Sequence, residues 1–243
     1  MHMADREQRP VIGVMQPYLF PYLGYFQLIG AVDKFVIYDD VNYIKSGWIN
    51  RNRILVNGQA HLFTLPLKKA GSFTKINSIE LDPQATSTWY AKFRRTLAQS
   101  YGRAPYLNEV LAILDRIFIV PHLRLADLLL ASIREVLAYV PIGTELVASS
   151  TSYANDHLHG QARILDICCQ EGAGKYINAI GGQELYARDA FSARNMELAF
   201  LKSRLPEYHQ GKHPFVPGLS ILDAMLNVPP DEIRDMLIAY DLV

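Results

Sequence analysis

The amino-acid sequence predicts an α/β fold with a Rossmann-like, mostly parallel sheet and flanking helices. Three observations predict it. The chain opens with an apolar run, a helical stretch and a second apolar run, the pattern of a βαβ unit. Further short apolar runs alternate with helical segments after residue 144. Between these regions, residues 85–140 have helical spacing of leucines and predict a helical insertion.

The opening βαβ unit places polar residues at the ends of two strands. Apolar runs at residues 11–15 and 35–38 flank a helical segment at 22–32. Such a connection is right-handed, so the two strands are expected to be parallel. The first run ends at Gln16-Pro17-Tyr18 and the second at Asp39-Asp40. Because functional residues gather at the carboxyl ends of parallel strands, both segments are site candidates.

The remaining elements are expected to complete a single domain. Asn57-Gly58 has the residues that a type I′ turn prefers and predicts a hairpin. Its strands are residues 53–56 and 60–65, and further strands are predicted at 145–148, 175–179 and 196–201. Helices are predicted at 86–100, 107–120, 123–140, 161–170, 219–227 and 230–240. We expect residues 11–243 to form one α/β domain with a helical subdomain at 85–140, after a flexible N-terminus at 1–10.

Composition narrows the possible partners. Lys and Arg number 24 and Asp and Glu also number 24, so a nucleic-acid polymer, which requires a basic excess, is not an expected partner. No run approaches the roughly 18 apolar residues of a membrane span, and no signal-peptide pattern is present, so we expect a cytoplasmic protein. The adjacent Cys168 and Cys169 lie in an apolar helical pattern and are expected to be buried thiols. No metal site is predicted, because the histidines and cysteines lack ligand spacing.

Paired carboxylates at a strand end can serve as a general base or bind a metal. Asp39 and Asp40 are such a pair, although a cap of a turn or helix is an equally good interpretation. Neighbouring residues on a strand point to opposite faces, so one of the two is expected to face a given site.

A second polar cluster follows this pair, from Lys45 to Arg53. It combines the ring of Trp48 with two guanidinium groups and two amides: Lys45, Trp48, Asn50, Arg51, Asn52 and Arg53. Arginine binds phosphate through a bidentate fork, and tryptophan stacks on a sugar or base. A small anionic ligand such as a nucleotide sugar is therefore favoured over a solvated turn.

Two later segments also carry polar groups. Ser149-Ser150-Thr151 can cap a helix or bind phosphate through hydroxyls and backbone amides. Tyr208-His209-Gln210 lies in a polar loop, where His209 is a candidate general base or a surface residue. No Gly-x-Gly-x-x-Gly or Walker motif occurs, which disfavours ordinary NAD or P-loop binding.

Residues distributed over most of the chain resemble the WbqC-like protein family. The resemblance lies in Gln16–Phe26, Asp33–Val41, Trp48–Ile54, Ala104–Tyr106, Ser149-Ser150, Gly172-Ala173 with Tyr176, His209-Gln210 and Leu219–Asn227. Tyr22 departs from it, since the family usually has tryptophan there.

The resemblance implies a role in the biosynthesis of O-antigen or other surface polysaccharide, with glycine transfer to an amino sugar suggested for one relative. It implies these site residues: Gln16, Tyr18, Tyr25, Asp39, Asp40, Trp48, Asn50, Arg51, Asn52, Ser149, Ser150, Tyr176, His209 and Gln210. The opening unit is also similar to nucleotidylyltransferases, with Tyr22 and Tyr25 where those enzymes have histidines.

Three hypotheses follow. The first is an acyl or aminoacyl transferase acting on a nucleotide-linked amino sugar, with Asp39, Asp40 or His209 as the base and Arg51 and Arg53 on the diphosphate. It requires an activated acyl or aminoacyl donor, from a small molecule or a carrier protein, and no other cofactor is predicted. The second is a nucleotide-activating enzyme similar to nucleotidylyltransferases. The third is a non-catalytic module that binds a sugar nucleotide or a partner enzyme.

Overall fold

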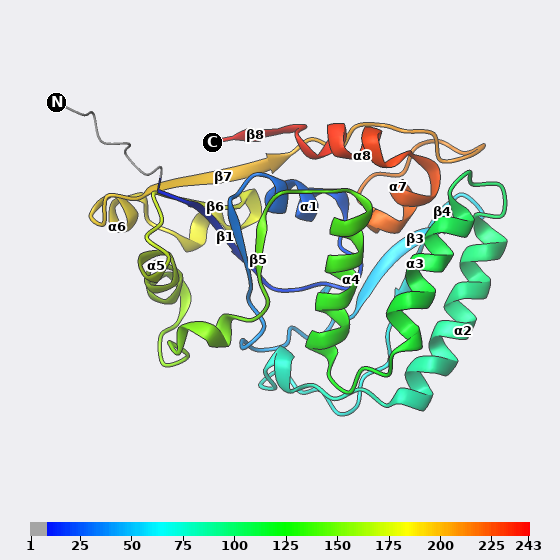
Figure 1. Ribbon diagram of the computed structural model, residues 1–243, viewed down its shortest axis with the longest axis horizontal. Coiled ribbons are helices and arrows are strands. Elements are labelled where there is room, and N and C mark those ends of the chain that lie inside the picture. The colour runs from blue at the N-terminus through cyan, green and yellow to red at the C-terminus, as the bar shows by residue number, and fades with distance from the viewer. Residues whose placement is uncertain (1–8) are drawn as a thin grey trace.

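A six-stranded sheet forms the centre of the computed structural model, which describes residues 9–243 (Figure 1). Its strands are β1 (Val11–Met15), β2 (Lys34–Ile37), β5 (Glu145–Val147), β6 (Lys175–Ala179), β7 (Glu197–Ser203) and β8 (Tyr240–Leu242). Every neighbouring pair is parallel except β7 and β8. The predicted α/β fold with a mostly parallel, Rossmann-like sheet is confirmed. Of the N-terminus predicted to be flexible, residues 1–8 lie outside the described part of the chain.

The order of the strands identifies where a ligand is expected. Across the sheet the order is β5-β2-β1-β6-β7-β8. Strands added after β1 extend the sheet first on one side, through β2 and β5, and then on the other, through β6 and β7. The direction therefore reverses between β1 and β6. Doubly wound sheets bind ligands outside the carboxyl ends of their strands at this reversal.

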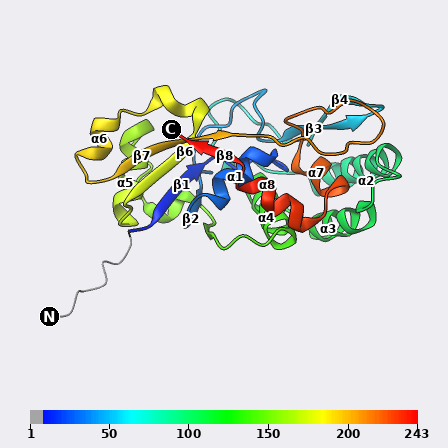
Figure 2. The ribbon, with the colours of Figure 1, turned by 90° about the horizontal axis from the view of Figure 1, so that it is seen from above.

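Two apolar layers cover the two faces of the sheet. Alternate residues of each strand point to opposite faces, so Phe35 and Ile37 belong to one cluster and Val36 to the other. Helices α1 (Leu23–Gly30) and α8 (Pro230–Leu237) pack on the first face (Figure 2). Helices α5 (Gly160–Gln170) and α6 (Arg188–Ser192) pack on the second.

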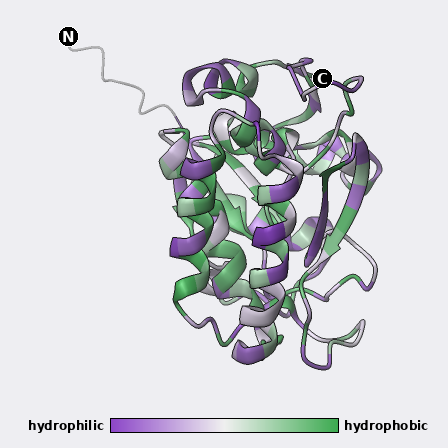
Figure 3. Ribbon diagram, turned by 90° about the vertical axis from the view of Figure 1, so that its right-hand side faces the viewer, coloured by the Kyte–Doolittle hydropathy of each residue, from purple (hydrophilic) through white to green (hydrophobic). Residues whose placement is uncertain are grey.

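The segment between β2 and β5 forms a separate layer beside the sheet. It contains the antiparallel hairpin β3 (Arg51–Val56) and β4 (Gln59–Thr64), and helices α2 (Pro83–Ser100), α3 (Leu107–Ile119) and α4 (Leu125–Tyr139). Asn57 and Gly58 have φ angles of 52° and 76°, as a type I′ turn requires, so the predicted hairpin is confirmed. Asp82 caps α2 by accepting hydrogen bonds from the amides of Gln84 and Ala85, at 2.9 and 3.0 Å. Green and purple alternate around these helices in Figure 3, as expected for helices with one buried face.

The C-terminal region differs from the prediction. A single helix was expected at residues 230–240, but α8 ends at Leu237 and residues 240–242 form β8. The backbones of Phe200 and Val243 exchange two hydrogen bonds, at 2.9 and 3.0 Å. This short apolar end therefore pairs with the open edge of β7. Its local pattern is compatible with either structure, and the available edge decides.

Short 3₁₀ turns join the larger elements: η1 (Ile76–Ser78), η2 (Ser150–Tyr153) and η3 (Ile180–Leu185). Helix α7 (Ile221–Asn227) packs against α3 and β3 and joins the sheet to the hairpin layer. Among residues 9–243, no helix combines the length and apolarity needed to cross a bilayer.

Candidate ligand-binding site

The loop from β1 to α1 leaves the sheet at the reversal of strand order and has a constrained backbone. Phe20 is fully buried and has a φ of 44°, a left-handed conformation that costs free energy for a residue with a side chain. Two donors hold its carbonyl oxygen: Asn52 Nδ2 at 2.6 Å and Ser220 Oγ at 2.8 Å. The amide of Leu19 also donates to the carbonyl of Ile49, at 2.9 Å. The hairpin and the C-terminal segment together therefore set the shape of this loop.

Asn52→Ala is expected to lower the free energy of unfolding by about 1–3 kcal/mol, because the buried carbonyl of Phe20 loses a donor. Asn42→Ala is the matched control, because Asn42 is exposed, and it should change stability by less than about 0.5 kcal/mol. Urea unfolding of both variants measures the difference. Equal stabilities would show that the asparagine does not hold the loop.

A pocket of about 250 Å³ opens beside this loop. Its lining combines three aromatic rings with polar groups: Tyr18, Pro21, Tyr22, Trp48, Asn52, Arg53 and Gly218. Trp48 is 45% exposed, so part of its ring is accessible from the pocket, and the guanidinium carbon of Arg51 lies 5.8 Å from the ring centre. The volume is slightly below the range of about 300–1,000 Å³ that is usual for small-molecule sites.

Arg53 supplies positive charge to this pocket. Its guanidinium carbon lies 5.4 Å from the centre of the Trp48 ring, within the range of a cation–π contact. One terminal nitrogen, Nη2, donates to the carbonyl of Gly218 at 3.2 Å. Its Nε is buried and has no hydrogen-bond partner within residues 9–243. A buried donor without an acceptor is costly, and an anionic ligand would satisfy it if the guanidinium turns toward the pocket on binding.

The rest of the Lys45–Arg53 cluster has structural contacts. Arg51 donates to the carbonyls of Gly47, at 2.7 Å, and Ser46, which stabilises the turn that carries Trp48. The buried Asn50 accepts from the Tyr43 hydroxyl and donates to the Leu65 carbonyl, both at 2.8 Å. Lys45 is exposed and does not line the pocket.

The carboxylates predicted as a base lie in a different, buried cluster. Asp39 and Asp40 are each 4% exposed. Asp39 Oδ1 accepts from Ser149 Oγ at 2.7 Å and from the Ser150 amide at 3.2 Å. Asp40 accepts from Ser150 Oγ and forms an ion pair with Arg163. The expectation that only one aspartate faces a given site is not met, because both follow the end of β2 and the Ser150 side chain contacts both.

Burial raises the pKa of Asp39, and the hydrogen bonds from Ser149 and Ser150 oppose this shift. Arg163 was missed by the sequence analysis, although a charged residue beside Ile164 and Leu165 on an apolar helix face was the available signal. It is 2% exposed, donates through Nε to Asn155 at 2.9 Å, and lies 5.0 Å from the Tyr38 ring centre. These contacts indicate that the cluster joins β2, β5 and α5.

The other predicted site residues are distributed over the molecule. The buried Tyr25 hydroxyl donates to the Gln16 carbonyl at 3.1 Å, which makes it a support of the loop. Tyr176 is fully buried against Phe191 in the layer under α5 and α6. His209 and Gln210 line a separate cavity near the hairpin turn. The single site expected from the sequence is therefore divided among several places.

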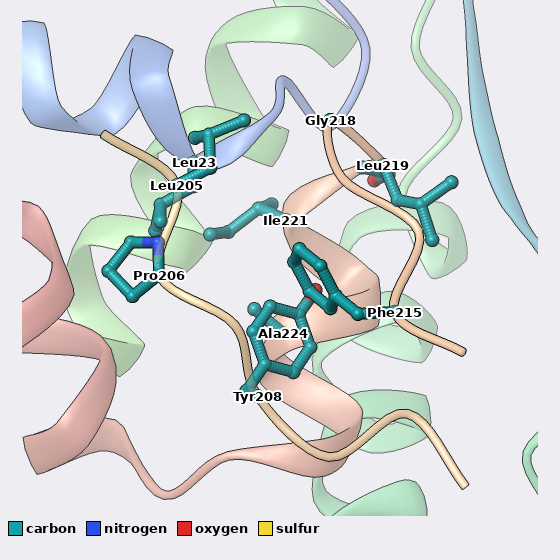
Figure 4. A pocket seen from close by; sticks show the side chains of 10 residues that line it. Leu23, Leu205, Pro206, Tyr208, Phe215, Gly218, Leu219, Ile221 and Ala224 are labelled. Atoms are coloured by element: carbon teal, nitrogen blue, oxygen red, sulfur yellow. The ribbon is translucent and has the colours of Figure 1, made fainter. Parts of the chain in front are cut away.

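A third, apolar pocket lies where the segment before α7 packs on α1 (Figure 4). Leu23, Leu205, Tyr208, Phe215 and Ile221 point toward one another there. Its volume of about 20 Å³ holds about one water molecule. It is a packing defect rather than a ligand site.

Comparison with known proteins agrees with the residue patterns. The profile of the WbqC-like protein family matches residues 16–235. The chain belongs to the WbqC-like protein family. This WbqC-like chain is also 29% identical over 230 residues to an uncharacterized protein of Mycobacterium tuberculosis (strain ATCC 25618 / H37Rv), Rv1507c. The match covers 92% of this chain and 97% of that protein. Both the loop after β1 and the Trp48 pocket lie within the part of the WbqC-like chain that the family profile matches.

Proposed function

We propose that the protein binds a nucleotide-linked amino sugar in the Trp48 pocket and transfers an acyl or aminoacyl group, such as glycyl, to its amine. The product would serve surface-polysaccharide biosynthesis, such as that of O-antigen. The observation that carries the proposal is the exposed Trp48 ring beside the unpartnered Nε of Arg53. A nucleotide sugar offers a flat base or sugar face and a diphosphate, and these two groups recognise both.

Position also supports this site. The pocket lies at the loop after β1, where strand order reverses and doubly wound folds bind nucleotides. The loop is held before any ligand arrives, by Asn52 and Ser220. A held loop loses less entropy on binding, which favours affinity.

The proposed reaction needs little from the protein beyond positioning. The amine nitrogen attacks the acyl carbonyl, the bond to the donor's leaving group breaks, and the amine proton passes to an acceptor. Asp39, Asp40 and His209 do not line the pocket. The proposal therefore assigns binding and orientation to Trp48 and Arg53 and assigns no base.

The nucleotide-activating alternative has less support from the same loop. Enzymes of that kind open a helix N-terminus toward the triphosphate. Here Gly24, in the first turn of α1, packs so closely on Ser203 and the Tyr22 ring that a Cβ would overlap both. Segment 218–221 also contacts the residues just before α1, through the hydrogen bond from the Ile221 amide to the Pro21 carbonyl at 2.8 Å.

Calorimetric titration with a panel of nucleotide-linked amino sugars tests the proposal. Trp48→Ala should weaken binding about tenfold or more, because stacking on an aromatic ring contributes about 1–3 kcal/mol. Arg53→Gln should weaken it comparably by removing the charge from the diphosphate. Lys45→Gln is the control, since this exposed lysine lies nearby but does not line the pocket.

Mass spectrometry of the bound sugar, incubated with activated acyl and aminoacyl donors, tests the transfer. An added acyl mass on the sugar amine is the expected result. Binding without any mass gain would support a non-catalytic binding module instead. Binding that neither variant weakens would contradict the assignment of the pocket.

A further inference from the structure

A second and larger cavity lies at the end of the hairpin layer that contains the turn between β3 and β4. Its volume is about 710 Å³, and it is formed by the turn of β3 and β4, the end of α2 and the loop at 209–213. The hairpin and α2 lie side by side at this end of the molecule (Figure 2). The lining includes Leu55 and Gly58 of the hairpin, Tyr101 at the end of α2 and Gln210 of the loop. The volume suits a ligand larger than a single ion.

The lining carries positive and ionisable nitrogen groups and no carboxylate. Arg103, Lys212, His209 and His213 all belong to it, and all four are exposed. Within residues 9–243, none of the four makes an ion pair or a side-chain hydrogen bond. These four side chains are therefore free to receive an anion, and we call the cavity that they line the cationic cavity.

Buried hydrogen bonds hold the walls of the cavity in place. Asp223 is fully buried and accepts from the hydroxyls of Tyr101 and Tyr208, at 2.6 and 2.7 Å, and from Gln210 Nε2 at 2.8 Å. Gln210 also exchanges two hydrogen bonds with the backbone of Val216. The loop that presents His209 and Lys212 is thus anchored to α2 and α7.

Gly58 positions one of the imidazoles. The His213 ring lies so close to the turn that a Cβ at Gly58 would overlap it. This contact places the imidazole against the hairpin turn at the wall of the cavity.

The end of α2 does not account for this charge. The dipole of a helix places about half a negative elementary charge at its C-terminus. One lysine or arginine is sufficient to complement it. The cavity has two full cations and two imidazoles, which is more than the helix dipole requires. None of the four donates to a carbonyl of α2.

The two pockets share structural elements. Arg53 lines the Trp48 pocket and Leu55 lines the cationic cavity, and residues two apart on a strand face the same side. The C-terminal segment also serves both, through Gly218 in one and His213 in the other. Two ligands bound in these pockets would be neighbours along β3.

We propose that the cationic cavity is a second ligand site, which binds the phosphate groups of a small phosphorylated molecule. If the proposed function holds, that molecule is the acyl donor, and this part of the inference rests on the proposed function. The proposal that the cavity binds phosphate groups does not depend on the proposed function.

NMR titration of the histidine ring protons with inorganic pyrophosphate tests the site in the full chain. Signals are assigned by His209→Gln and His213→Gln variants. Saturable shifts of both rings are expected, whereas His61 and His122, which do not line the cavity, should not shift. An absence of shifts at His209 and His213 would overturn the proposal.

Charge variants separate this site from general attraction. Arg103→Gln/Lys212→Gln should weaken pyrophosphate binding about tenfold or more. Lys92→Gln/Arg95→Gln is the matched control, because it removes the same charge from exposed positions on α2 outside the cavity. It should change the affinity no more than about twofold. Equal weakening by both double variants would overturn the proposal.

The Trp48 pocket is monitored independently by titrating a nucleotide sugar against Trp48→Ala. Pyrophosphate binding with no nucleotide-sugar binding would support the second site and contradict the assignment of its ligand as the acyl donor. Nucleotide-sugar binding with no pyrophosphate response would support the proposed function and contradict the second site.

Discussion

Arg163→Met is expected to lower the free energy of unfolding by about 3–5 kcal/mol, the cost of leaving one charge of a buried pair without its partner. Arg163 and Asp40 are 2% and 4% exposed, so water cannot replace the lost contact. Asn155 also loses the donor to its Oδ1. Urea denaturation followed by circular dichroism measures the change.

Two further variants show whether the buried charge is the cause. Asp40→Asn/Arg163→Met removes both charges and should lose less stability than Arg163→Met alone. Arg204→Met breaks the pair with Asp241, in which the two side chains are 66% and 40% exposed, and should cost no more than about 1 kcal/mol. A double variant as unstable as the single one would show that packing, and not charge, explains the loss.

Asp223→Ala is expected to cost about 3–5 kcal/mol, because two buried hydroxyls and one amide lose their common acceptor. The anchored loop at 209–213 should also lose order, so pyrophosphate binding should weaken in this variant. Denaturation and the NMR titration measure the two effects. Asp231→Ala is the control, because Asp231 is exposed at the start of α8 and its change should be within about 1 kcal/mol.

The stability that Asp223 contributes should also depend on pH. Burial raises its pKa, and the hydrogen bonds from Tyr101, Tyr208 and Gln210 oppose the shift. An acid with a higher pKa in the folded state binds its proton more tightly there than in the unfolded chain, where the pKa is about 3.9. Its contribution is therefore largest below that value and decreases as the pH rises through the folded pKa. The difference in free energy of unfolding between wild type and Asp223→Asn should decrease accordingly, and a constant difference would contradict this account.

Local sequence patterns were sufficient to predict most elements of the fold. The βαβ unit, the hairpin at Asn57-Gly58 and the three helices between residues 83 and 139 appear where the periodicity and turn residues placed them. These features depend on near neighbours in the chain, because turn residues and amphipathic spacing act over a few residues. Motifs spread from Gln16 to Asn227 also identified the family, whose profile matches residues 16–235.

The division of the site depended on contacts that no local pattern contains. Asp39, Trp48 and His209 looked like parts of one site, but Asp39 is buried in hydrogen bonds to Ser149 and Ser150, and His209 lines a different cavity from Trp48. Arg163 is separated from Asp40 by 123 positions in the chain, yet the two form a buried pair.

By itself, then, the sequence determined the fold class and the family, and it predicted which residues have binding chemistry. Only the tertiary structure decided which of them meet. Arg53 reaches Gly218, 165 positions away, and the last residues join the sheet as β8 rather than extending α8. The physical reason is that these contacts depend on which strand edges and apolar faces remain open after the local elements have formed, and that is a property of the whole packed chain.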